Sequence, residues 1–335
     1  MATEITDQLN RPIRDLRISL TDRCQFRCQY CLPAEHVDVM RQHSKPENHL
    51  SFQEIHAITS AFARLGVEKV RLTGGEPLLR KNLHELISNI KQINGIKEVA
   101  LTTNGALLDP VLDELIAAGL DRITISMDAI DQQLFEQMTG TRYQVSDIIN
   151  TINRCADSDL KKVKVNCVLQ KGINEHQVMP LLQLFRGTGV EVRFIEFMDV
   201  GNINGWQQQQ VLESHQVLQQ IADKWPHQAL PASHPGEVAN RHRFTDGQGE
   251  FGLISSISEP FCLDCNRARL SAQGEVYTCL FGQQGHPVRA LSKLPDELFD
   301  RLSTIWQQRS DRYSMDRKQQ RKTAGKKIEM FVIGG

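Results

Sequence analysis

Six of the eight cysteines fall into two groups of three, one near each end of the chain. The first group has the spacing C-x3-C-x2-C and consists of Cys24, Cys28 and Cys31. The second group consists of Cys262, Cys265 and Cys279. Three thiolates can bind three irons of a [4Fe–4S] cluster and leave the fourth iron without a protein ligand. Each group is therefore a candidate site for a cluster with one open iron.

Zinc is the alternative metal for the same cysteines. A four-cysteine zinc site could combine the last two cysteines of the first group with the first two of the second. This combination leaves one cysteine of each group unexplained. The second group alone would need a fourth ligand, such as His242 or His286, so its spacing leaves cluster and zinc both open. The two remaining cysteines, Cys155 and Cys167, fall at apolar positions and are expected in the core.

The bulk composition fits an ordinary globular protein of 335 residues. Apolar residues make up 40% and charged residues 24%, with a formal net charge of −1. Such a balance gives no overall attraction for nucleic acid or a membrane. The first residues contain no apolar stretch of the signal-peptide type, and no run approaches the ~20 apolar residues of a membrane-spanning helix. We therefore expect a cytoplasmic protein with reduced thiols that binds neither nucleic acid nor membranes.

Short β-branched runs alternate with helical patterns through the first two thirds of the chain. The predicted strands cover residues 15–20, 69–73, 98–102, 122–127, 162–169 and 191–197. Between them, Ser51 and Glu54 form a possible capping box, Asp109-Pro110 opens a helix that Gly119 can end, and Ser146 precedes another helical pattern. Six such units in a row predict a parallel sheet with right-handed crossovers. The expected fold is a partial (β/α)6 barrel.

Polar side chains recur on one face of these strands. Alternate residues of a strand point to opposite faces, so the aliphatic face should pack on the helices. The opposite face should then line the barrel interior. The polar residues on that face are Arg17 and Ser19, Thr124 and Ser126, and Lys164 and Asn166. A barrel lined in this way is expected to hold a polar ligand rather than a packed apolar core.

The segment from about 206 to 260 is rich in Gln, His, Pro and Gly. We interpret it as a linker that passes into a second, less regular domain. The expected organisation is a core barrel over residues 8–229 and a C-terminal domain over residues 230–335. The second domain would carry the second cysteine group, close the barrel mouth and end in a Gly-Gly tail.

Two motifs resemble the radical SAM (S-adenosylmethionine) superfamily. The first cysteine group reads C-x3-C-x-aromatic-C, with Tyr30 as the aromatic residue. After the second predicted strand, Gly74-Gly75-Glu76-Pro77 is similar to the superfamily's GGEP motif, which contacts the methionine end of SAM. The resemblance implies that the open iron of the first cluster binds SAM and reduces it, which yields a 5′-deoxyadenosyl radical.

The second cysteine group resembles one family within that superfamily. The pattern C-x2-C-N-R-x-R, a third cysteine at Cys279 and a terminal Gly-Gly are similar to the GTP 3′,8-cyclase (MoaA) family. The resemblance implies two [4Fe–4S] clusters, the second of which binds the guanine of GTP. The radical takes hydrogen from ribose C3′, and C3′ then attacks C8 to give 3′,8-cyclo-7,8-dihydro-GTP. This is the first step of molybdenum cofactor biosynthesis.

The same resemblance assigns site residues. The SAM contacts are expected at Tyr30, Gly75, Ser126 and Met198. The GTP contacts are expected at Arg17, Arg71, Thr102, Lys164, Arg193, Arg267 and Arg269. The tail residues Gly334 and Gly335 are expected to reach into the site beside Arg17. Simple alternation places Arg193 and Met198 on opposite faces, so a bulge or a strand end must lie between them.

The remaining implications concern the partners of the protein and the alternative functions. The chain has no P-loop motif, so a triphosphate would need several arginines and lysines instead. The family implies an electron donor of the reductase or flavodoxin type, a homodimer, and transfer of the product to cyclic pyranopterin monophosphate synthase (MoaC). The alternative enzyme is a radical SAM peptide-modifying enzyme with an auxiliary cluster. The alternative outside enzymes is a zinc-stabilised binding protein.

Overall fold

The computed structural model describes residues 4–38, 46–323, 325 and 327–334. The predicted tail residue Gly335 therefore lies outside the described residues. Within them, all strands belong to one sheet of twelve in the order β12-β11-β10-β1-β2-β3-β4-β5-β6-β9-β8-β7. No helix of this described part is long and apolar enough to span a membrane.

The six predicted strands form the centre of this sheet and run parallel to one another. They are β1 (Asp15–Ser19), β2 (Lys69–Thr73), β3 (Glu98–Thr103), β4 (Arg122–Ser126), β5 (Lys162–Leu169) and β6 (Glu191–Glu196). Each end lies within one residue of the predicted one. The sheet curves without closing, because β1 and β6 pair with β10 and β9 instead of with each other. The predicted partial barrel is confirmed.

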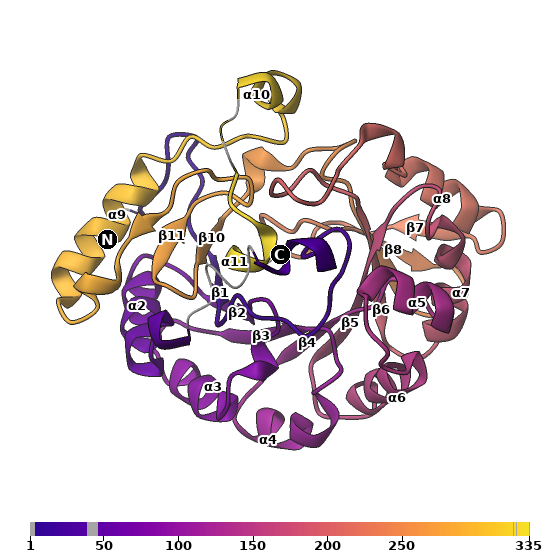
Figure 1. Cartoon of the computed structure of the whole chain (residues 1–335), viewed down its shortest axis with the longest axis horizontal. Helices are drawn as coiled ribbons and strands as arrows, with labels where there is room; N and C mark the ends of the chain where they lie inside the picture. Colours follow the sequence, from indigo (N-terminus) through magenta and orange to yellow (C-terminus); the bar gives the residue numbers. More distant parts are fainter. Residues whose placement is uncertain (1–3, 39–45, 324, 326, 335) are drawn as a thin grey trace.

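Helices cover the convex side of the curved sheet (Figure 1). Those that follow the parallel strands are α2 (Phe52–Arg64), α3 (Leu83–Lys91), α4 (Leu112–Ala117), α5 (Gln132–Thr139), α6 (Val145–Ala156) and α7 (Val178–Phe185). The predicted capping box starts α2, since the Glu54 amide donates to Ser51 Oγ at 3.2 Å and the Ser51 amide donates to Glu54 Oε2 at 2.7 Å. The aliphatic strand residues, such as Leu16 and Ile18, are fully buried beneath these helices.

The segment 206–260 is not a linker, so that interpretation was wrong. It contains α8 (Ser214–Ala222), β7 (His227–Ala229), β8 (Asn240–Phe244) and β9 (Glu250–Ile254). β9 runs parallel to β6 and extends the sheet, with β8 antiparallel beside it. These elements are amphipathic: α8 buries Val217 and Ile221 and exposes glutamines, which gives the segment its polar composition.

The other edge of the sheet is built from residues after Pro260. β10 (Arg267–Leu270) lies parallel to β1, and β11 (Glu275–Tyr277) and β12 (His286–Pro287) follow as antiparallel strands. A turn joins β10 to β11, where the Gly274 amide donates to the Ser271 carbonyl at 3.1 Å. The chain continues through α9 (Pro295–Gln307) and α10 (Arg317–Thr323). It reaches α11 (Met330–Ile333) at the centre of the barrel view, where the C-terminus lies (Figure 1).

Candidate active site

The first cysteine group lies in the loop after β1, packed against the turn after β2. The Gly75 amide donates to the Thr21 carbonyl at 2.6 Å, and the Glu76 amide donates to the Arg23 carbonyl at 2.7 Å. A Cβ atom on Gly75 would collide with the carbonyl of Arg23. Glycine is therefore required for this close backbone approach, which holds the segment before Cys24 in place.

Buried carboxylates at the strand ends hold the cysteine loop. Glu76 accepts hydrogen bonds from the Thr103 hydroxyl at 2.7 Å and from the Asn104 amide at 2.9 Å, so it joins the ends of β2 and β3. Burial raises its pKa to about 7. Asp128, after β4, accepts a hydrogen bond from the Tyr30 hydroxyl at 2.8 Å, and burial raises its pKa to about 6.

The first three thiols suit a cationic metal group. None of them forms a disulfide, and all three are partly exposed. Burial raises the pKa of Cys24 to about 11 and that of Cys28 and Cys31 further. The thiols therefore need a metal to become thiolates. Cluster ligands bind different irons and need not converge on one point, which fits three cysteines spread along a loop.

The described residues form no zinc site of the kind considered above. Within them, no three His, Cys, Asp or Glu side chains converge as ligands of a single metal ion. His242 instead stacks on Phe251, with a centroid distance of 5.2 Å, and lies edge-on to His227 at 4.9 Å. The second cysteine group therefore lacks the histidine ligand that a structural zinc would require among these residues.

The second cysteine group opens onto a cavity in the barrel interior. Cys262 and Cys265 precede β10, Cys279 follows β11, and all three line this cavity. Burial opposes ionisation of Cys265, but the guanidinium groups of Arg267 and Arg309 lower its pKa to about 6. Burial raises the pKa of Cys279 to about 12. Thiols that converge on one cavity beside cations fit a metal cluster of negative overall charge.

The cavity that the second cysteine group borders is also lined by all seven predicted GTP residues. They are Arg17, Arg71, Thr102, Lys164, Arg193, Arg267 and Arg269. Of the predicted SAM residues, Met198 lines this cavity, whereas Tyr30, Gly75 and Ser126 do not. Arg193 and Met198 both reach it because β6 ends at Glu196, between them. The strand end that alternation required is confirmed.

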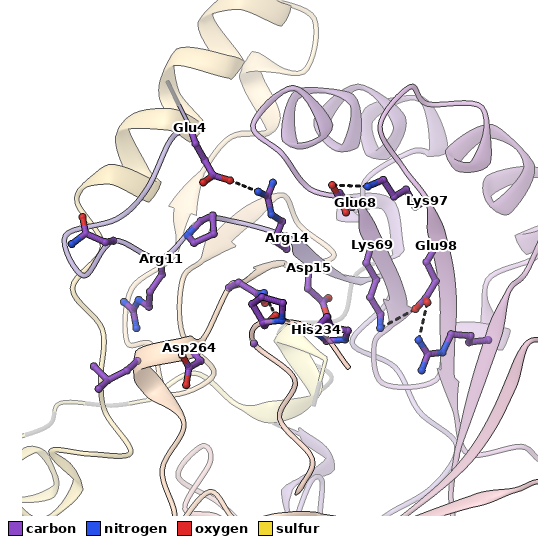
Figure 2. Close-up of a pocket in the computed structure, with 17 residues that line it drawn as sticks. Glu4, Arg11, Arg14, Asp15, Glu68, Lys69, Lys97, Glu98, His234 and Asp264 are labelled. Carbon is purple, nitrogen blue, oxygen red and sulfur yellow. Dashed lines mark hydrogen bonds and ion pairs between the residues drawn. The ribbon is translucent and has the colours of Figure 1, made fainter. Parts of the chain in front are cut away.

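The charged residues inside the barrel form two layers with different electrostatics. Near the base of the strands, Glu98 pairs with Lys69 at 2.8 Å and with Arg122 at 2.7 Å, so the cations of this layer have a carboxylate partner (Figure 2). One layer further in, Arg71 donates only to the hydroxyls of Thr102 and Thr124, at 3.0 and 3.1 Å. The second layer is therefore rich in positive charge, which the carboxylates of Asp15 and Glu98 offset only in part.

Arg17 is a buried cation of this second layer that is crowded by other positive charges. Its Nε atom is buried and has no hydrogen-bond partner among the described residues. Burial and the neighbouring charges of Arg269 and Arg267 lower its pKa well below the usual value, although Asp15 partly offsets them. Cations held close together without paired carboxylates are expected to bind an anion.

Three charged residues of this site escaped the sequence reasoning: Arg309 and Asp311 line the cavity, and Glu191 pairs with residues that line it. Glu191, only 2% exposed, forms an ion pair with Arg193 and approaches Lys164 Nζ to 3.9 Å. It lies two residues before Arg193 and therefore on the same face of β6. The strand phase could have identified it. Glu191 fixes the positions of two predicted GTP residues and partly neutralises them.

The C-terminal tail reaches this cavity region. Arg269 Nη1 donates hydrogen bonds to the carbonyls of Gly334 and, at 3.3 Å, of Ile333. A Cβ atom on Gly334 would collide with the side chain of Thr73. Arg269 is paired in register with Arg17 across β10 and β1. The described end of the chain therefore lies beside β1, which α11 contacts, and beside its neighbours β2 and β10.

Comparisons with known proteins agree with this geometry. The Radical SAM superfamily matches residues 18–185, and the family Molybdenum Cofactor Synthesis C matches residues 190–315. A GTP 3′,8-cyclase of Xanthomonas axonopodis pv. citri (strain 306) is 47% identical over 336 residues, and the alignment covers both chains completely. A GTP 3′,8-cyclase of Staphylococcus haemolyticus (strain JCSC1435) is 43% identical, again over the full length of both chains.

Solved structures support the fold. The crystal structure of Streptococcus suis SuiB superposes with a TM-score of 0.61, at 14% sequence identity, and the match covers 87% of this chain and 66% of that chain. At this low sequence identity, the superposition is evidence for the fold but not for the function.

Proposed function

The chain belongs to the GTP 3′,8-cyclase family of the radical SAM superfamily, and from this premise we infer which of its residues perform the reaction. It is an enzyme that cyclises GTP by radical SAM chemistry in molybdenum cofactor biosynthesis. The observation that carries the assignment of residues is the layer of cations beside Cys262, Cys265 and Cys279.

Cys24, Cys28 and Cys31 hold the first [4Fe–4S] cluster in this proposal. When bound, this cluster and SAM supply the one-electron chemistry that removes a hydrogen atom from the substrate. The protein contributes the position of the loop, which the Glu76 amide, the Asn104 side chain and the Asp128 carboxylate bind at the ends of β2, β3 and β4. The residues proposed to contact SAM are Tyr30, Gly75, Ser126 and Met198.

Cys262, Cys265 and Cys279 would hold a second [4Fe–4S] cluster, which would supply an iron without a protein ligand for the guanine base. The triphosphate is bound by the cations of the second layer, which replace the missing P-loop. Support comes from two of these cations. Arg17 Nε has no hydrogen-bond partner among the described residues, and Arg71 donates to the neutral hydroxyl of Thr102, so both gain most from a bound anion. Gly334 and Gly335 are proposed to complete the site from the C-terminal side.

We extend the proposal to organisation and partners. The chain is divided into a barrel over residues 8–229 and a second-cluster domain over residues 230–335. It functions in the cytoplasm as a homodimer and receives electrons from a reductase or flavodoxin-type donor. Its product is passed to cyclic pyranopterin monophosphate synthase (MoaC).

Lys164 provides a pH-linked prediction for GTP binding. Burial and the charge of Arg193 lower its pKa to about 5, against the opposing charge of Glu191. The amine is therefore mostly neutral near pH 7 in the free protein, and a triphosphate beside it raises this pKa. GTP binding near pH 7 should take up about one proton, and the affinity should fall as the pH rises above the free-state pKa.

Titration calorimetry in buffers of different ionisation enthalpy measures this proton. Lys164→Met should abolish the uptake, whereas the control Lys162→Met, whose ammonium is paired with Glu191 at 3.1 Å, should retain it. Equal proton uptake by the wild type and Lys164→Met would show that Lys164 is not the titrating group.

The experiment that tests the whole proposal is anaerobic purification, iron and sulfide analysis, and incubation with SAM, reductant and each of the four nucleoside triphosphates. We expect about eight irons per chain, formation of 5′-deoxyadenosine and consumption of GTP alone. About four irons would contradict the second cluster but leave the first. Cleavage of SAM without loss of GTP would contradict the assigned substrate site.

A further inference from the structure

The backbone of the second cysteine group is bound by two buried arginines from distant parts of the chain. Arg11 Nη1 donates to the Cys262 carbonyl at 2.5 Å, and Arg309 Nη1 donates to the Cys265 carbonyl at 2.6 Å. Both arginines are almost completely buried. Figure 2 shows Arg11 extending from the N-terminal segment toward the loop that carries Asp264. In the sequence, Asp264 lies between Cys262 and Cys265.

Asp7 connects the two arginines. Its Oδ2 atom accepts a hydrogen bond from Arg11 Nε at 2.6 Å and lies 3.4 Å from Arg309 Nη1. Its Oδ1 atom accepts the Arg11 amide at 2.9 Å, which fixes the turn that presents this arginine. Asp311 adds its carbonyl, 2.9 Å from Arg11 Nη1, and its carboxylate, 3.6 Å from Arg309 Nε. The four side chains form one network beneath the cysteines.

The stability of the fold does not account for this network. Burying several charges costs desolvation energy, and apolar side chains of similar volume often stabilise a protein at least as well. Arg11 Nη2 and Arg309 Nε also remain without hydrogen-bond partners in the described structure. Arg309 lies over the Trp306 ring at 4.6 Å and borders the same cavity as the three cysteines, so its charge is close to any cluster bound there.

The two guanidinium groups can act on a bound cluster in two ways. Their hydrogen bonds fix the backbone of two of its ligands, as outer-shell partners of metal ligands commonly do. Each positive charge also favours the reduced cluster, which carries one more negative charge than the oxidised cluster, and thereby offsets the opposite effect of the Asp7 and Asp311 carboxylates in the same network. Net charge and hydrogen bonding around a cluster set its reduction potential.

We propose that Arg309 and Arg11, joined by Asp7, are positioning residues that fix Cys262 and Cys265 and raise the reduction potential of the second cluster. The inference rests on the proposed function, which places a cluster at these cysteines. It gives the N-terminal segment around residue 7 a role in a site that lies about 250 residues away in the sequence.

The test uses the full chain with Cys24, Cys28 and Cys31 replaced by alanine, so that iron–sulfur signals come from the second group alone. Into this parent we introduce Arg309→Gln, Arg309→Lys and the control Arg312→Gln. Arg312 is close in sequence but half-exposed, and it pairs with Asp316 at 2.8 Å. After anaerobic reconstitution, iron is quantified and the potential is determined by redox titration monitored by electron paramagnetic resonance.

Arg309→Gln should shift the potential to more negative values with an unchanged iron content, while Arg309→Lys and Arg312→Gln stay near the parent. An unshifted potential in an iron-loaded Arg309→Gln, or an equal shift in Arg312→Gln, overturns the inference alone. A parent that assembles no iron overturns the second cluster and the inference together. If Arg309→Gln does not fold, Arg11→Gln tests the same expected shift.

Discussion

Replacing Cys265 by alanine should stop the cyclisation of GTP while 5′-deoxyadenosine is still formed. The reason is the separation of the two cysteine groups: Cys265 lines the cavity with the cations, whereas the loop that carries Cys28 is fastened to the ends of β2, β3 and β4. Cys28→Ala should therefore abolish both products, because the cleavage of SAM depends on the first cluster. Chromatography of the anaerobic reaction mixture quantifies 5′-deoxyadenosine and the cyclised nucleotide separately.

A third cysteine provides the matched control. Cys155 is fully buried in the hydrophobic core, away from both groups. Cys155→Ala should cost about 1–2 kcal/mol of folding stability but keep the iron content and both products. Normal cyclisation by Cys265→Ala would contradict the two-cluster scheme, and continued SAM cleavage by Cys28→Ala would contradict the assignment of the first cluster.

Replacing Arg17 by methionine should weaken GTP binding strongly and leave the free protein at least as stable as the wild type. Arg17 is crowded by Arg269 and Arg267, and its Nε atom has no partner in the described structure. Removal of its charge therefore relieves repulsion and desolvation in the free protein. In the complex, the loss of a charge-assisted hydrogen bond costs about 1.5–3 kcal/mol, which raises the Kd for GTP roughly 10- to 100-fold.

Equilibrium binding of GTP to the iron-loaded protein and denaturant unfolding of the free protein measure the two effects. The control is Lys97→Met, which removes an exposed ammonium paired with Glu68 at 2.9 Å and should change neither quantity appreciably. A lower stability of Arg17→Met together with unchanged GTP affinity would make Arg17 a structural residue and remove it from the substrate site.

The sequence determined the local features of this protein. Short β-branched runs identified six strands to within one residue, and alternation placed Arg17, Thr124 and Lys164 on the inner face, because both patterns depend only on neighbouring residues. The capping box of α2 was predictable for the same reason. The spacing of the first cysteine group likewise indicated an iron–sulfur cluster without knowledge of the fold, whereas that of the second left cluster and zinc open.

Tertiary structure alone decided which segments meet. Strand pairing between β1 and β10 brings Arg269 beside Arg17, and pairing between β6 and β9 makes the polar segment 206–260 part of the sheet. The structure also separates paired cations, such as Lys69, from those without a carboxylate. These contacts join residues far apart in the chain, and no local pattern encodes the register between distant strands. A charge is most available to a ligand where packing has left it without a partner.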